Sequence, residues 1–282
     1  MKFSFKIFMA LIVMSAIMLS CRSTEDPKIP ETNGLQNLLK VQEITNSTHA
    51  IELYTVRGTF QTGYNDITLR IRNLSNNQYE ANANITWTPR MHMTSMTHSC
   101  PRSAITPSAT SLYHGYIVFQ MPQNNTEYWD LTLDYVLNGV AYTATAPITV
   151  QPVQRKNVNA VLGADGQRYV IAHIEPSSPK VAINNWTVGI WKMQDMMTFP
   201  VANGLKLKLD PRMPGMGNHS SPNNEDAIQS QTNGFYQGKV SLTMTGYWKL
   251  NLQLLAADGS ILKGEAVTDI HPASSLFFEL EF

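Results

Sequence analysis

Methionines are concentrated in two loops of this chain. Four of the 14 methionines lie within the first 18 residues, and the other ten lie in or beside a motif that occurs twice. The first copy contains MHMTSMTHSC and the second contains MPGMGNH. A thioether sulfur is a neutral, polarisable donor that binds Cu(I) well and hard cations poorly, and imidazole and thiolate strengthen such a site. The two loops therefore predict copper binding as Cu(I), with Ag(I) as a mimic.

The candidate ligands are the soft donors of both loops and two methionines of a third connection. They are Met213, Met216 and His219 in the second copy, Met91, His92, Met93, Met96, His98 and Cys100 in the first, and Met196 and Met197 in the connection. Pro214, Gly215 and Gly217 prevent a regular helix, so that the second loop can curl around an ion. We expect Met193, Met196 and Met197 to reach the same end of the second domain.

Other metals fit these loops less well. Neither methionine loop contains Asp or Glu, the oxygen ligands that calcium and magnesium require. Zinc would prefer more Cys, His or carboxylate ligands than the loops provide. The six soft donors of the first loop cannot all bind one ion, so some of them must have another role.

Methionine also fills irregular gaps in hydrophobic cores. In that interpretation Met91 and Met213 plug the open ends of two domains and bind nothing. For Met121 and Met244, which lie at the ends of alternating strands, packing is the expected role.

The motif belongs to a longer tandem duplication. Residues 84–101 align with residues 205–222, and Tyr128-Trp129 aligns with Tyr247-Trp248, with offsets between 119 and 123 residues. Each copy has the length of an ordinary domain. We predict two domains, at residues 43–152 and 158–282.

The elements that position the loops are expected to be strands. Apolar residues recur with period two, as in Trp129, Leu131 and Leu133, and this alternation is typical of antiparallel sheets with one buried face. Asn138-Gly139 and Asp258-Gly259 are hairpin turn signals. The predicted fold is all-β, with two tandem immunoglobulin-like β-sandwich domains.

The N-terminus resembles a bacterial lipoprotein signal. Lys2 and Lys6 lead into an apolar run at residues 7–19, which is shorter than a membrane-spanning helix and ends at Ser20-Cys21. We predict a signal peptide at residues 1–20, lipidation of Cys21 and a polar, flexible tether at residues 21–42. The protein would then lie at the bacterial cell envelope, with the membrane as a partner through this lipid.

Composition excludes several functions. The chain has 21 basic and 21 acidic residues, a balance that argues against nucleic acid as a partner. It has no Gly-rich phosphate loop, no G-x-S-x-G elbow and no H-E-x-x-H motif. A lone thiol at Cys100 has no identifiable base, so we predict that the protein is not an enzyme.

The second copy resembles the FixH/YtkA-like family of small extracytoplasmic β-sandwich domains. The resemblance rests on residues 213–219, on Gly234-Phe235-Tyr236 and on residues 244–248. It implies a β-sandwich in a copper-handling context, and the first copy resembles the family less.

Two functions follow from these patterns. The first is an envelope-anchored lipoprotein that buffers Cu(I) or transfers it, with a copper exporter or an oxidase-assembly protein as its partner. The alternative is a non-catalytic, immunoglobulin-like structural or adhesion module whose methionine loops are hydrophobic plugs.

Overall fold

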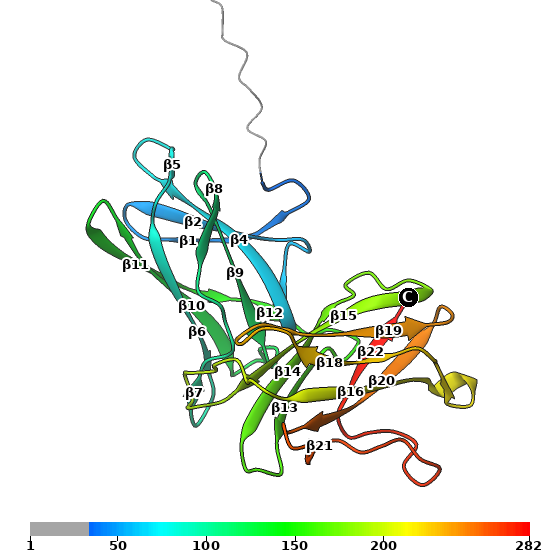
Figure 1. Ribbon diagram of the computed structural model, residues 1–282. Helices are drawn as coiled ribbons and strands as arrows, with labels where there is room; N and C mark the ends of the chain where they lie inside the picture. Colours follow the sequence, from blue (N-terminus) through cyan, green and yellow to red (C-terminus); the bar gives the residue numbers. More distant parts are fainter. Residues whose placement is uncertain (1–33) are drawn as a thin grey trace, which may run out of the picture. The chain divides into compact units, whose positions relative to one another are not determined.

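The computed structural model describes residues 34–282, and the regular secondary structure in this range is almost entirely β-strand (Figure 1). The only helix in this range is a short 3-10 turn, η1 (Pro214–Met216). The all-β class predicted from the alternation is therefore confirmed. The predicted signal peptide, Cys21 and the first part of the tether lie outside the described residues.

The strands of the first repeat form two main sheets. One contains, in spatial order, β1 (Leu39–Thr45), β2 (His49–Thr55), β4 (Gly63–Asn73), β9 (Leu112–Phe119) and β8 (Thr106–Ala109), with β5 (Tyr79–Glu80) on β4. The other contains β11 (Val140–Ile148), β10 (Tyr128–Leu137), β6 (Asn84–His92) and β7 (Thr97–His98). The short strands β3 (Phe60–Gln61) and β12 (Val150–Gln151) pair in parallel. Leu69 of the first sheet and Trp129 and Leu133 of the second share one buried core, as in a β-sandwich.

The second repeat repeats most of this pairing in one continuous sheet. Its order is β13 (Val158–Leu162), β14 (Arg168–Glu175), β15 (Ala182–Lys192), β19 (Tyr236–Leu242), β18 (Glu225–Gln229), β16 (Lys206–Met213), β20 (Tyr247–Leu255) and β21 (Ile261–Lys263). Two further strands, β17 (His219–Ser220) and β22 (Phe277–Glu281), pair with β16 and β20. Strand β18 is hydrogen-bonded to both β19 and β16, whereas β8 in the first repeat pairs with β9 alone.

Equivalent residues of the two repeats have equivalent contacts. Trp129 and Trp248 are both fully buried. The Trp129 indole Nε1 donates to the Met121 carbonyl oxygen at 3.1 Å, and the Trp248 indole Nε1 donates to the Met244 carbonyl oxygen at 3.0 Å. Each tryptophan therefore fixes the loop before its own strand, which gives the repeated Met and Trp positions a structural role.

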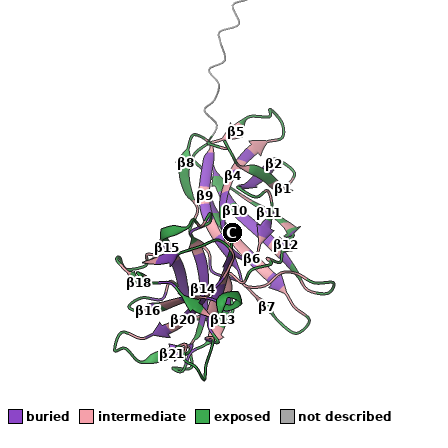
Figure 2. Ribbon diagram, turned by 90° about the vertical axis from the view of Figure 1, so that its right-hand side faces the viewer, coloured by how far each residue is buried: buried purple, intermediate pink, exposed green. Residues whose placement is uncertain are grey.

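Each repeat has its own apolar core, and a further apolar cluster is shared between the two repeats. Val118 of β9 packs with Val170, Trp191 and Phe199 of the second repeat, and all four side chains are buried. Figure 2 shows the buried residues along the central strands of both repeats. Residues Asn37–Phe282 form one compact unit. The joint between the repeats is therefore a packed contact in which apolar surface is removed from water.

Candidate metal-binding loops

Two of the predicted ligands in the first loop belong to the hydrophobic core. Met91 on β6 faces Trp129 across the ladder to β10, and both Met91 and Cys100 have no exposed surface. Burial raises the pKa of the Cys100 thiol far above its usual range. The thiolate is the form of cysteine that binds metal, so Cys100 is a poor ligand in the folded protein.

The two histidines of the first loop have different partners. His92 Nε2 lies 2.6 Å from Asp130 Oδ2, and the ring stacks on Tyr128 with centroids 4.7 Å apart. His98 Nδ1 donates to the Ser99 carbonyl oxygen at 2.7 Å, and its ring meets Trp129 edge-on. Neighbouring positions of a strand point to opposite faces, and His92 faces Thr97 while His98 faces Met91. The two imidazoles are therefore not brought together.

The turn between β6 and β7 carries the other two methionines of the first loop. The Met93 amide donates to the Met96 carbonyl oxygen at 2.9 Å and closes the turn. Met93 packs against the core of the first repeat, whereas Met96 is 46% exposed. Met96 is thus the thioether of the first loop that is most open to solvent.

The second loop places its three donors at one end of β16. Met213 and His219 are directly opposite one another in the β16–β17 ladder. Residues in such a pair project to the same face of a sheet with Cβ atoms about 5 Å apart. Met216 lies between them in η1 and is 58% exposed, whereas Met213 is 6% exposed.

Glycine and asparagine give the second loop its tight return. Gly217 and Asn218 both have positive φ, at 64° and 59°. Such angles are unfavourable for most residues but accessible to Gly and Asn. On the neighbouring β19–β20 loop, a side chain at Gly246 would begin 3.3 Å from Met213 Cε. The absence of a side chain there leaves room for the end of the Met213 thioether.

The prediction that Met193, Met196 and Met197 reach the Met213 end of the second repeat is wrong. Strand β15 runs antiparallel to β19, and Ala182 at its start pairs with Leu242, just before the loop that leads to β20. The end of β15 at Lys192, from which the three methionines follow, is therefore at the opposite end of the repeat. Strand direction is not encoded in the local spacing of the methionines.

The Met193–Met197 connection instead contacts the first repeat. The Ser99 amide donates to the Met196 carbonyl oxygen at 2.8 Å, and Arg102 Nη1 donates to the Met197 carbonyl oxygen at 3.2 Å. Met193 packs in the apolar cluster shared by the two repeats. These methionines therefore belong to the joint between the repeats, where Met196 is exposed at its edge.

One residue in contact with a candidate ligand, Asp130, was not predicted. Asp130, which holds His92, lies 38 residues away in sequence, and its Oδ1 is buried without a hydrogen-bond partner in the described residues. The alignment of the two copies places Lys249 at the position of Asp130, so the duplication gave no signal for it.

Any metal site in these loops depends on methionine. Within residues 34–282 no three His, Cys, Asp or Glu side chains are grouped so that they could hold a metal ion. In the same range, no helix has the length and apolar character needed to cross a membrane.

Comparison with known proteins does not identify a family. The chain matches no protein-family model and no curated protein. The resemblance to the FixH/YtkA-like family therefore stays a prediction from the residues quoted above.

Proposed function

We propose that this protein is a non-enzymatic copper-binding lipoprotein of the bacterial cell envelope, built from two immunoglobulin-like sandwiches. Its Cu(I) site is the end of the second repeat, formed by Met213, Met216 and His219. In this proposal the protein buffers Cu(I) or passes it to a copper exporter or an oxidase-assembly protein.

One observation carries the choice of the second loop. The register of β16 and β17 puts Met213 opposite His219, and η1 holds Met216 in the turn that joins them. Two thioethers and one imidazole are a neutral, soft ligand set that suits a monovalent copper ion. The exposed Met216 and His219 would be the entry side of the site, and the largely buried Met213 its inner side.

The first loop is proposed to be mainly structural. Met91 and Cys100 are core residues, and His92 and His98 point to opposite faces of the sheet. This loop therefore lacks a convergent set of three soft donors, although its sequence is richer in them.

The test is a titration of the reduced protein with Cu(I) against a chromophoric chelator. We expect one tightly held copper per chain, and a weakening of about tenfold or more, or about 1.4 kcal/mol, in Met216→Leu. Met216 is exposed, so this substitution leaves the core intact. Met196→Leu is the matched control, because Met196 is 43% exposed and lies at the opposite end of the repeat. No retained copper, or equal retention in Met216→Leu and the unaltered protein, would count against the site.

Burial of Met91 and Met213 favours a second candidate function. Both thioethers pack into apolar cores, as plugs at the ends of two sandwiches would. The protein would then be a structural or adhesion module without a metal. This second function predicts that Cu(I) leaves the thermal unfolding temperature unchanged, whereas a ligand that binds only the folded state raises that temperature.

Attachment to the membrane is a separate part of the proposal. It rests on the apolar run at residues 7–19 followed by Ser20-Cys21. Cells given labelled palmitate should incorporate the label into this protein and should not incorporate it into the Cys21→Ala variant. Equal labelling of both would contradict lipidation at Cys21.

A further inference from the structure

The second repeat contains a polar groove on the outer face of β15 and β19. Its volume is about 760 Å³, and the segment that follows β14, including Pro176 and Lys180, lines it together with the two strands. Cavities of about 300 to 1,000 Å³ are typical of small-molecule sites. A second cavity, near Asp226 and Gln253, is about 300 Å³.

The floor of the groove is made by cross-strand pairs. Asn185 pairs with Lys239 and Thr187 pairs with Gln237. These positions alternate with Trp186, whose side chain packs in the core, so the four polar side chains lie on the outer face. The side chains of Asn185, Thr187 and Gln237 form no hydrogen bond with another described residue, although side chains around them do.

Strand β18 closes one side of the groove because glycine lets it approach. A side chain at Gly238 would begin 2.4 Å from the Glu225 carbonyl oxygen. This close approach brings Glu225 next to Lys239, and their side chains form an ion pair at 3.0 Å. The unpaired side chains of Asn185, Thr187 and Gln237 therefore lie beside the ion pair of Lys239 and Glu225.

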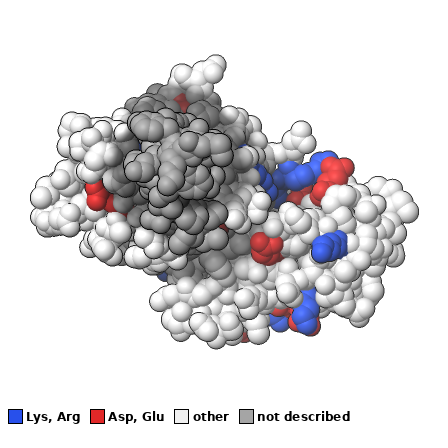
Figure 3. Space-filling model, turned by 90° about the horizontal axis from the view of Figure 1, so that it is seen from above, with Lys and Arg blue, Asp and Glu red and all other residues white. Residues whose placement is uncertain are grey.

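The charges of the lining balance. Glu175 and Glu225 are matched by Lys180 and Lys239. Glu225 is paired with Lys239, and the Glu175 carboxylate accepts hydrogen bonds from the Ser177 amide and hydroxyl, the former at 2.6 Å. The groove has no surplus of cations that would select a phosphate or a carboxylate ligand. Figure 3 shows one face of the molecule, on which acidic and basic side chains are few and lie in an otherwise uncharged surface.

We propose that this groove binds a short neutral oligosaccharide. Amide side chains both donate and accept hydrogen bonds, and they can pair with the adjacent hydroxyl groups of a sugar without a charge on the ligand. Two unpaired amides, Asn185 and Gln237, and the Thr187 hydroxyl, with Gln237 directly across from Thr187, present donors and acceptors side by side, as the adjacent hydroxyl groups of a sugar require. The groove lies on the second repeat alone, and its function does not depend on copper.

The experiment measures binding of three neutral trisaccharides, maltotriose, cellotriose and chitotriose, by titration calorimetry and by NMR of the labelled protein. We expect saturable binding of at least one of them, with shifts at Asn185, Thr187 and Gln237. The double variant Asn185→Ala with Gln237→Ala should weaken that binding at least tenfold. Both residues are exposed, so the fold should survive, which a thermal unfolding measurement checks.

The matched control is Gln194→Ala, an exposed glutamine in the connection after β15 and outside the groove. It should bind the sugar as the unaltered protein does. Absence of binding for all three trisaccharides, equal binding by the double variant, or preferential binding of trialanine over every sugar would overturn the proposal. None of these results depends on whether the protein retains Cu(I).

Discussion

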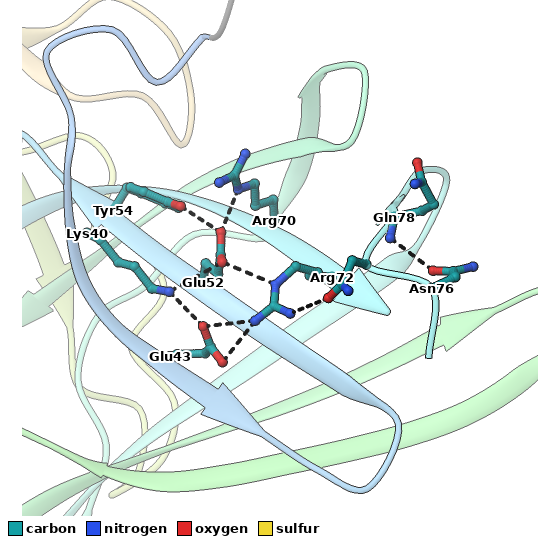
Figure 4. A network of polar contacts seen from close by, with 9 residues as sticks. Lys40, Glu43, Glu52, Tyr54, Arg70, Arg72, Asn76 and Gln78 are labelled. Carbon is teal, nitrogen blue, oxygen red and sulfur yellow. Dashed lines mark hydrogen bonds and ion pairs between the residues drawn. The ribbon is translucent and has the colours of Figure 1, made fainter. Parts of the chain in front are cut away.

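A buried carboxylate in the first repeat gives a sharp test of the electrostatics. Glu52 on β2 is 5% exposed. It accepts hydrogen bonds from the Tyr54 hydroxyl and Arg70 Nε, both at 2.6 Å (Figure 4). Lys40 and Arg72 complete its surroundings at 3.3 and 3.5 Å. Burial by itself would raise the pKa of Glu52, but the hydrogen bonds from Tyr54 and Arg70 and the nearby cations outweigh burial and lower the pKa to about 2.

The sign of the pH dependence follows from this lowered pKa. The ordinary value is 4.5, so the unfolded chain takes up a proton at higher pH than the folded protein. The stabilisation is therefore complete above about pH 5 and is lost as the pH falls toward 2. A difference between 4.5 and about 2 corresponds to about 3 kcal/mol, of which about 2 kcal/mol is already lost at pH 3.

The variant Glu52→Gln should consequently lower the free energy of unfolding by about 3 kcal/mol at pH 7 and by about 1 kcal/mol at pH 3, measured by urea denaturation. Glu43→Gln is the control. Glu43 contacts Lys40 and Arg72 from a more exposed position, and its loss should cost less than about 1 kcal/mol. Equal effects of Glu52→Gln at the two pH values, or an equal cost for the two variants, would refute this account of the network.

Three further predictions concern packing. Met91→Ala should lower the free energy of unfolding by about 3 kcal/mol, because it leaves a cavity beside Trp129. Met96→Ala, at an exposed position, should change the free energy of unfolding by less than about 0.5 kcal/mol. Similar urea midpoints for the two variants would contradict the burial of Met91. The Cys100 thiol should not react with a chromogenic disulfide reagent at pH 8 in the native protein and should react fully in urea, since burial raises its pKa and excludes the reagent; rapid native labelling would show that the site is open. Gly238→Ala should destabilise the protein by about 2 kcal/mol in thermal or urea unfolding, because the new methyl group meets the Glu225 carbonyl oxygen; an unchanged stability would mean that β18 does not approach β19 so closely.

The strands could be predicted from the sequence because their signal is local. Period-two alternation, as in Trp129, Leu131 and Leu133, reports directly which side chains are buried, and all three lie in the core. The same alternation also indicates burial of Met91. Ile85, Trp87 and Met91 fall on one face of β6, so the burial of Met91 follows from its place in that series.

The positions of the loops relative to one another could not be predicted. Met196 lies near Ser99 because β15 runs away from the Met213 end, and strand direction and order are properties of the whole sheet. The contact between His92 and Asp130 likewise depends on how β6 and β10 pair. Residue type showed which side chains could bind a soft metal, but only the register shows that Met213 faces His219.

The double pairing of β18 has a mechanical consequence. In the second repeat β18 is hydrogen-bonded to both β19 and β16, so separating the two layers would break ladder hydrogen bonds as well as expose apolar surface. In the first repeat β8 is joined to β9 alone, and side-chain packing does most of the work of holding the layers closed. Under mechanical load the two layers of the first repeat would separate before those of the second. Met213 and His219 lie in the second repeat, whose layers are joined by hydrogen bonds through β18.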